Sequence, residues 1–217
     1  LNGDITLSDV PAADGVTFAS AVTIGDGKSI TITTDSGHAT ADGKVQFDST
    51  LSGIETTGKV ATDESLTIVS GTGNVTITGN IGATAGNGTI TEGALGTVTI
   101  GNTATDALTL GGTVYNTNAA TYEAKTNADS ISLTGTSPTF TSSDDAITFT
   151  GGRVKLTDGT FTVNSNSGPI TIGDIKGTGA DNVTLNAGTA DSTDATVTVG
   201  AIGAGNKIAI VSITGND

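Results

Sequence analysis

Few side chains in this sequence can do catalytic chemistry. The 217 residues include one histidine and no cysteine, methionine or tryptophan. His38 lies in the segment TDSGHATADG, where Asp35 and Ser36 are close along the chain. A catalytic triad is defined by geometry rather than by neighbourhood in sequence, and Gly, Ala and Asp around a histidine are typical of a solvated turn. No GxSxG, HExxH or GxxxxGK[S/T] motif occurs either.

One group of residues could support acid–base chemistry. Asp144 and Asp145 are followed closely by Arg153, the single arginine, and Lys155. An acidic pair with a basic proton acceptor is what a polysaccharide lyase needs, often together with Ca²⁺. The alternative is that the two aspartates form a turn and RVKL is a strand with its polar face outward. Saccharide sites usually offer aromatic side chains for stacking, and the strand pattern buries Phe149. We therefore expect no enzymatic activity and keep the lyase as an alternative.

Calcium is the one cofactor that the sequence suggests. Hard oxygen ligands are plentiful because the chain has 18 aspartates and 4 glutamates. Neither an EF-hand loop nor a GGxGxD repeat occurs, so turn aspartates that bond their own backbone are the alternative interpretation. The candidate Ca²⁺ ligands are Asp144, Asp145, Asp181, Asp191 and Asp194.

The overall composition limits the partners. The formal net charge is −14 at pH 7, so the chain would repel nucleic acid and anionic membranes. It has no apolar run long enough to span a membrane. Side chains that oxidise easily are missing, which suits an extracellular location. The chain begins at Leu1, and we expect it to be a segment or processed subunit of a larger protein.

Short apolar-Thr-apolar triplets recur along the whole chain. Two apolar side chains of each triplet face one way and Thr faces the other, which predicts a short, half-buried β-strand. No stretch has apolar residues at helical spacing, and the sequence therefore predicts an all-β protein. The triplets lie at 5–7, 16–18, 22–24, 30–32, 66–68, 75–77, 98–100, 108–110, 147–149, 170–172, 183–185 and 197–199.

The triplets repeat with a regular period. A triplet followed by Gly or Thr-Gly starts at positions 22, 75, 98, 170 and 197, so successive starts differ by 53, 23, 72 and 27. A unit of about 25 residues fits these intervals two, one, three and one times. The period predicts a parallel β-helix (β-solenoid) of about nine coils, as a single domain over 1–217. An immunoglobulin-like sandwich stays open, although its core usually holds an aromatic anchor.

One line of sequence is written twice. Each copy joins two triplets by a short polar link that contains Ser and Gly. The copies are LTIVSGTGNVTITGNIG at 66–82 and FTVNSNSGPITIGDIKG at 161–177. Their separation is close to four coils, and we expect their Ile and Val residues to stack. Two segments interrupt the rhythm, 54–65 and 111–130, and we expect both to be protruding loops.

The repeated runs resemble a known family. DESLTIVSGTGNVTITGNIG, ADNVTLNAGTADSTDATVTVGAIG and GVTFASAVTIGDGKSITITTDSG are similar to the β-strand repeats of filamentous-haemagglutinin-type bacterial surface proteins. The resemblance extends over most of the chain. It implies a right-handed parallel β-helix, secretion, and a role as an adhesin shaft or surface filament. It carries no catalytic residue onto this sequence.

We therefore expect a structural extracellular protein, a shaft, filament or sheath element of the cell surface. Its partners would be further copies of itself or adjacent repeats. One alternative is an adhesin module that binds a glycan or host surface through 54–65 and 111–130. Another is ice binding through Thr-x-Thr rows, whose spacing along the chain is irregular; they lie at 31–33, 76–78, 97–99 and 196–198.

Overall fold

The protein consists of short parallel β-strands. A computed structural model describes residues 1–8, 11, 13–35, 42–54, 63–82, 94–126, 129–188, 195–203 and 206–215. Within these ranges there are strands and no helix, which confirms the all-β prediction. None of this described structure contains a helix that is long and apolar enough to cross a bilayer. All twelve predicted triplets lie in or overlap strands.

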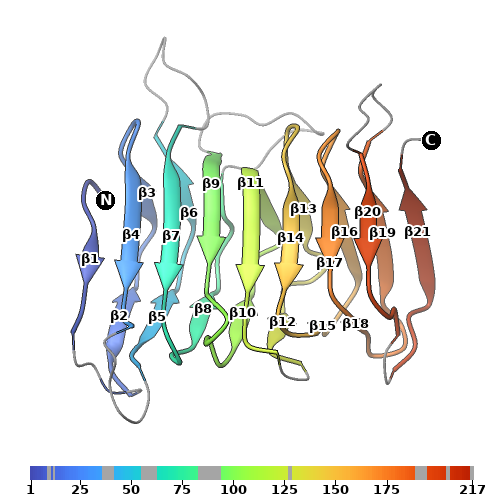
Figure 1. The fold of residues 1–217 in the computed structure, drawn as a ribbon, viewed down its shortest axis with the longest axis horizontal. Helices are drawn as coiled ribbons and strands as arrows, with labels where there is room; N and C mark the ends of the chain where they lie inside the picture. The colour runs from blue at the N-terminus through green and yellow to red at the C-terminus, as the bar shows by residue number, and fades with distance from the viewer. Residues whose placement is uncertain are drawn as a thin grey trace.

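The strands form three ladders in which every pair is parallel. Ladder A faces the viewer in Figure 1. Its strands are β1 (Ile5–Thr6), β4 (Ser29–Thr33), β7 (Ser65–Val69), β9 (Leu95–Ile100), the second half of β11 (Val114–Glu123), β14 (Ile147–Thr150), β17 (Ile170–Ile172) and β20 (Val197–Val199).

Ladders B and C complete the set. Ladder B contains β2 (Gly15–Phe18), β5 (Lys44–Phe47), β8 (Val75–Ile77), β10 (Leu108–Leu110), β12 (Ile131–Leu133), β15 (Val154–Leu156) and β18 (Ile175–Lys176). Ladder C contains β3 (Val22–Ile24), β6 (Leu51–Gly53), the start of β11, β13 (Thr139–Thr141), β16 (Thr160–Asn164), β19 (Asn182–Asn186) and β21 (Ile210–Thr214). Ile81 and Ile202 continue ladders C and B as single bridges.

The chain visits the ladders in the order A, B, C and then starts again; we call one such passage a coil. The described strands make eight coils, and the chain advances steadily along the long axis from one terminus to the other (Figure 1). The coils differ in length: Val154 pairs with Ile175 in a short coil, and Ile30 pairs with Leu66 in a long one. These stacked parallel sheets are consistent with the β-solenoid that the period predicts.

Alternating burial explains why the triplets form strands. In β8, β10 and β12 the outer two residues are buried and the middle one is half-buried. The inward side chains are mostly aliphatic and stack coil upon coil to form the core. Aromatic residues also contribute. The sequence pattern predicted this for Phe149 but not for Tyr115 and Phe140, whose rings stack with centroids 4.1 Å apart.

The interpretation of 111–130 as a protruding loop is wrong for half of its length. Val114–Glu123 forms β11, the longest strand, and Tyr115 and Tyr122 are fully buried. Its first residues pair with β13 in ladder C and its last with β14 in ladder A. The strand thus passes from one ladder to the next without a Gly-rich bend, which is why the triplet rhythm stops there. In the other expected loop, residues 55–62 lie outside the described ranges.

The twice-written line does not stack on itself. Leu66 pairs with Val98 in ladder A, whereas Phe161 pairs with Val183 in ladder C. The first copy turns from ladder A into B, and the second turns from C into A. The expectation that the two copies stack is therefore wrong, because unequal coil lengths move them onto different faces. The line encodes a bend, whichever ladders the bend joins.

Candidate functional site

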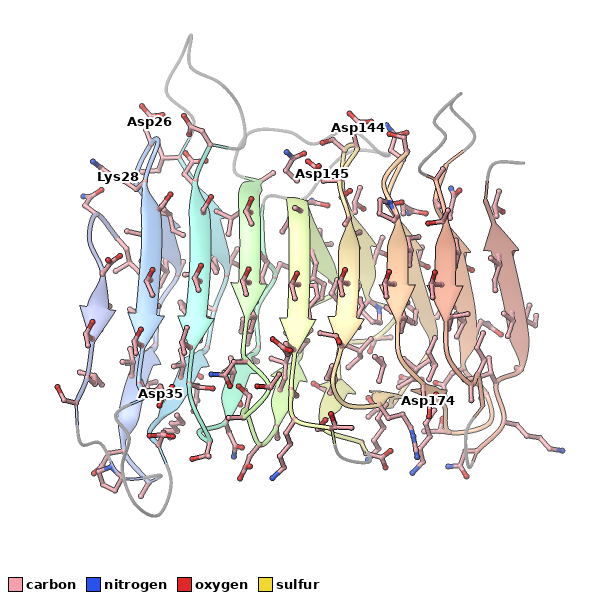
Figure 2. The ribbon with its side chains drawn as sticks, in the orientation of Figure 1. Asp26, Lys28, Asp35, Asp144, Asp145 and Asp174 are labelled. Carbon is pink, nitrogen blue, oxygen red and sulfur yellow. The ribbon has the colours of Figure 1, made fainter. Side chains whose placement is uncertain are left out.

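Asp144 and Asp145, two of the predicted calcium ligands, lie in the exposed bend between β13 and β14 (Figure 2). Asp144 Oδ1 accepts hydrogen bonds from Asn166 Nδ2 at 3.1 Å and Ser167 Oγ at 2.8 Å, both in the equivalent bend of the next coil. The Asp145 carbonyl accepts one from Ser142 Oγ. Both aspartates therefore contribute to the structure of stacked bends.

Asp181 lies in a different bend, between β18 and β19, and is fully buried. Its Oδ2 accepts hydrogen bonds from the backbone N–H and the hydroxyl of Thr178, and its buried Oδ1 has no hydrogen-bond partner. The bend of Asp144 joins ladder C to A, whereas that of Asp181 joins B to C. The structure does not bring these predicted ligands together, and Asp191 and Asp194 lie outside the described residues.

The lyase-like group is also separated. Strand β14 lies between the bend of Asp144 and Asp145 and the ladder-B residues Arg153 and Lys155. Arg153 Nη1 instead contacts Asp129 Oδ1 at 3.2 Å, and Lys176 Nζ contacts Asp129 Oδ2 at 2.7 Å. The hydrogen bond from Lys176 is the main cause that lowers the pKa of Asp129. Arg153 and Lys176 thus form ion pairs with Asp129 and not with Asp144 or Asp145. His38 lies outside the described ranges.

Among the described residues, one acidic group has metal-compatible spacing, and the sequence did not predict it. Asp26, Asp63 and Glu64 each offer a carboxylate oxygen within 4.8 Å of the others. Asp26 precedes β4 and the other two precede β7, and the pairing of β4 with β7 brings them together. Asp63 Oδ1 also accepts a hydrogen bond from Gly27 N at 3.0 Å. Aligning KSITI with ESLTI in the sequence would have revealed this neighbourhood.

Oxygen ligands of this kind suit a hard cation such as Ca²⁺, which takes six to eight of them. Glu64 is buried, Asp26 is half-buried and Asp63 is exposed. Three carboxylates would supply only part of such a coordination shell. The group is chemically compatible with a cation, and its geometry alone does not identify one.

A buried serine hydroxyl closes three of the described bends. Ser70, Ser142 and Ser165 each donate from Oγ to the carbonyl three residues later; for Ser70 the Oγ to Gly73 O distance is 2.9 Å. All three serines are fully buried. The twice-written line is therefore a strand, a serine-closed bend and a second strand.

Threonines line the outer face of ladder A in a continuous column. The pairing register places one outward threonine from each of seven successive strands side by side: Thr31, Thr67, Thr99, Thr121, Thr148, Thr171 and Thr198. Irregular spacing along the chain had obscured this column. The Thr-x-Thr row at 76–78 belongs to ladder B instead. Outward threonine is what β-propensity favours, so the column alone names no ligand.

Comparison with known proteins gives no relative. No family model, curated protein or solved structure matches the chain. What the protein does must therefore be inferred from its own geometry.

Proposed function

We propose that the chain is a length of parallel β-solenoid, with coils of roughly 25 residues, that acts as a structural element outside the cell. It would form part of a shaft, filament or sheath of the cell surface. The continuity of the ladders supports this role, since every coil contacts only its neighbours and the stack can be long in one direction. The resemblance of its repeat pattern to filamentous-haemagglutinin-type surface proteins, which no family model matches, is a further argument for this role.

The observation that carries the proposal is a set of hydrogen bonds in which a polar side chain of one coil contacts a neighbouring coil. We call these hydrogen bonds ties. A carboxylate or amide oxygen in one coil accepts a hydrogen bond from a neighbouring coil, at 2.8–3.0 Å, in six bends or strand ends. Five donors are backbone N–H groups and one is the hydroxyl of Ser167. The pairs are Asp4–Thr31, Asp42–Thr72, Asp63–Gly27, Asn80–Thr113, Asp144–Ser167 and Asp174–Ala201.

These ties give the acidic residues a mechanical role. A hydrogen bond to a charged group is stronger than one between neutral groups, and such ties resist sliding and opening of the coils that they join. Aspartates spread over successive bends suit a stiff rod better than a localised binding site. The adhesin alternative has no observation in its favour among the described residues, because Val114–Glu123 belongs to the ladders.

Two measurements test the proposal. Antibodies against the chain should label intact, unpermeabilised source cells, and labelling that requires permeabilisation would contradict an extracellular role. Small-angle scattering of the purified chain should give a rod whose length is about 33 Å for eight strands at the usual spacing of 4.7–4.9 Å. A scattering curve that a stack of eight parallel coils does not fit would contradict the solenoid itself.

A further inference from the structure

The threonine column of ladder A is a regular array on a flat face. It contains one outward threonine from each of seven successive strands, Thr31 to Thr198, and strand pairing sets neighbours about 4.8 Å apart. The ladder-A strands lie side by side with little twist (Figure 1), whereas open sheets usually twist. Threonine is β-branched and has few rotamers in a strand, so the array is rigid. Before Thr31 the column ends at Asp4, whose Oδ1 accepts a hydrogen bond from Thr31 N at 2.8 Å.

A row of short side chains flanks the column on one side. The residues two positions before the column threonines are Ser29, Ser65, Thr97, Ala119, Ala146, Pro169 and Thr196. Four of these seven carry a hydroxyl and none is charged. Two of the Thr-x-Thr rows of the sequence, 97–99 and 196–198, therefore lie on this face. No side chain in the flanking row is long enough to cover the column.

The face is uncharged, although the molecule as a whole is highly charged. The chain has 22 acidic and 8 basic residues, yet the strands of ladder A contain a single charged side chain, Glu123 at the end of β11. Carboxylates lie in the bends instead. Asp26 and Asp144 lie at one edge of ladder A, and Asp35 and Asp174 lie at the opposite edge (Figure 2). An uncharged strip thus runs along the rod between two charged edges.

The strip also offers no aromatic ring. The aromatic residues in the ladder-A strands, Tyr122 and Phe149, are fully buried in the core. Faces that bind sugars usually present such rings for stacking. The outward side chains of the described ladder-A strands are hydroxyls and short aliphatic groups, together with Glu123. A polysaccharide is therefore a poor match for this face.

Charge argues against most other occupants. A net charge of −14 repels nucleic acid and anionic surfaces. In a face-to-face contact between two copies of the chain, the acidic edges of both would meet. A basic partner would be attracted to carboxylates of the bends, such as Asp26 and Asp144, and not to the uncharged strands between them. The ligand that fits the strip is neutral, flat and periodic.

We propose that ladder A binds the surface of ice. Ice presents a rigid, neutral lattice of hydrogen-bond donors and acceptors, whereas liquid water has no fixed lattice. A rigid row of hydroxyls can contact many lattice positions at once, so that individually weak contacts act together. Little side-chain freedom is lost on binding, because the threonines are already fixed. This function goes beyond the proposed structural role and does not depend on it.

The pairing register removes the objection that the sequence raised. Along the chain, the threonine rows are irregularly spaced, because the coils differ in length. The extra residues lie in the bends and leave the register of ladder A unchanged: Thr67 pairs with Thr99, and Thr148 pairs with Thr171. An array that is irregular in sequence is therefore regular in space.

Ice growth in a solution of the purified chain tests the proposal. We expect faceted crystals and a gap between the melting and freezing temperatures. Thr121→Lys puts a long, charged side chain in the middle of the column and should abolish the gap. Thr109→Lys is the matched control, because Thr109 is the outward, half-buried middle residue of β10 in ladder B, and Thr121 is half-buried as well. The control should keep the full gap. Absence of a gap with the unmodified chain, or equal loss in both variants, would overturn the inference.

Circular dichroism shows whether each variant is folded. If Thr121→Lys loses its strand signal, Thr171→Lys replaces it, because Thr171 is an exposed residue of the same column in β17. A folded Thr171→Lys variant that still shapes ice like the unmodified chain would overturn the inference.

Other occupants of the face would give different results. Contact between copies would appear as dimers in analytical ultracentrifugation that Thr121→Lys removes. A neutral polysaccharide would appear as retention on insoluble cellulose that the same change removes. Either result, combined with ice growth that does not respond to Thr121→Lys, would overturn ice binding.

Scattering separates this inference from the proposed function. An intact rod without any effect on ice would overturn ice binding and leave the structural role standing. A chain that shapes ice but is absent from the cell surface would overturn the structural role alone.

Discussion

At the scale of single residues, buried serine hydroxyls close several bends. Because these hydroxyls do not reach water, they bond to backbone carbonyls of the protein instead. Ser165 is fully buried, and its Oγ donates to the carbonyl of Gly168. Ser142 repeats the arrangement one coil away, and Ser70 repeats it in a bend between other ladders, where its Oγ also lies 3.0 Å from Thr105 Oγ1. The serine in the link of the twice-written line is thus explained by a buried carbonyl.

Replacement of this serine should destabilise the protein measurably. Ser165→Ala removes the hydroxyl and leaves the buried Gly168 carbonyl without this donor, so we expect a loss of about 1–3 kcal/mol in the free energy of unfolding. Urea denaturation followed by circular dichroism measures it. Ser132→Ala, at a half-buried outward position of β12, is the control and should change stability by less than about 0.5 kcal/mol. Equal effects of both changes would contradict the role assigned to Ser165.

The glycine at the end of the bend is fixed by the neighbouring coil. A Cβ at Gly168 would lie 2.3 Å from the carbonyl oxygen of Asp145, and one at Gly73 would lie 2.1 Å from that of Gly43. Gly168→Ala should therefore cost about 1–3 kcal/mol through overpacking against backbone. At Gly173 the nearest atom would be 3.5 Å away. Gly173→Ala should leave the urea midpoint unchanged or raise it, and a comparable loss there would argue against the clash.

At the scale of elements, the sequence predicts strands well and their stacking poorly. Ile147-Thr148-Phe149 was readable as a half-buried strand and is β14. The pairing register between coils could not be predicted, because the number of residues between paired positions varies from coil to coil. It is much smaller for Val154 and Ile175 than for Ile30 and Leu66. The same variation hid the neighbourhood of Asp26 and Asp63, which are distant in sequence and adjacent through the pairing of β4 with β7.

Strand β11 shows why one element escaped prediction altogether. Its triplet rhythm is replaced by VYNTNAATYE, in which Asn116 and Thr117 are buried between the two tyrosines. Polar residues in the interior look like a loop in sequence. In the structure they lie where the strand passes from ladder C to ladder A, and the rings of Tyr115, Tyr122, Phe140, Phe149 and Phe161 fill the interior around them.

The tyrosines of β11 predict how stability depends on alkaline pH. Burial is the main cause that raises the pKa of Tyr115 and Tyr122 above the ordinary value of 10.0. The folded protein therefore keeps both phenol protons at a pH where the unfolded chain loses them, so unfolding becomes more favourable as pH rises above about 10. Below that pH the tyrosines should contribute no pH dependence.

Tyrosinate absorbance measures this directly. We expect the absorbance change and the loss of the strand signal in circular dichroism to occur together, above the ordinary pKa of tyrosine. Tyr122→Phe removes one of the two groups and also a buried hydroxyl that has no hydrogen-bond partner, so it should shift the alkaline transition to higher pH. Titration of both tyrosines near their ordinary pKa in a still-folded protein would contradict their burial.

At the scale of the whole molecule, stability is a sum over coils and their contacts. Ile147 pairs with Ile170, so the segment 147–169 forms one complete coil that contains β14, β15 and β16. Deletion of this whole coil removes one strand from each ladder and leaves the flanking strands able to pair in the old register. Deletion of 147–158 removes β14 and β15 only, so ladder C would have one strand more than its neighbours and the following strands would lose their partners.

The larger deletion should therefore be the better tolerated. We expect the variant without 147–169 to keep its strand signal and to form a rod shorter by about 4.8 Å, one strand spacing, although the loss of Phe149 and Phe161 lowers its melting temperature. The variant without 147–158 should lose cooperative melting. Scattering and thermal denaturation of the two proteins side by side decide the matter. If the shorter deletion were the more stable, the stack would not be built from interchangeable coils, because only a coil-wise stack makes the loss of a whole unit cheaper than the loss of part of one.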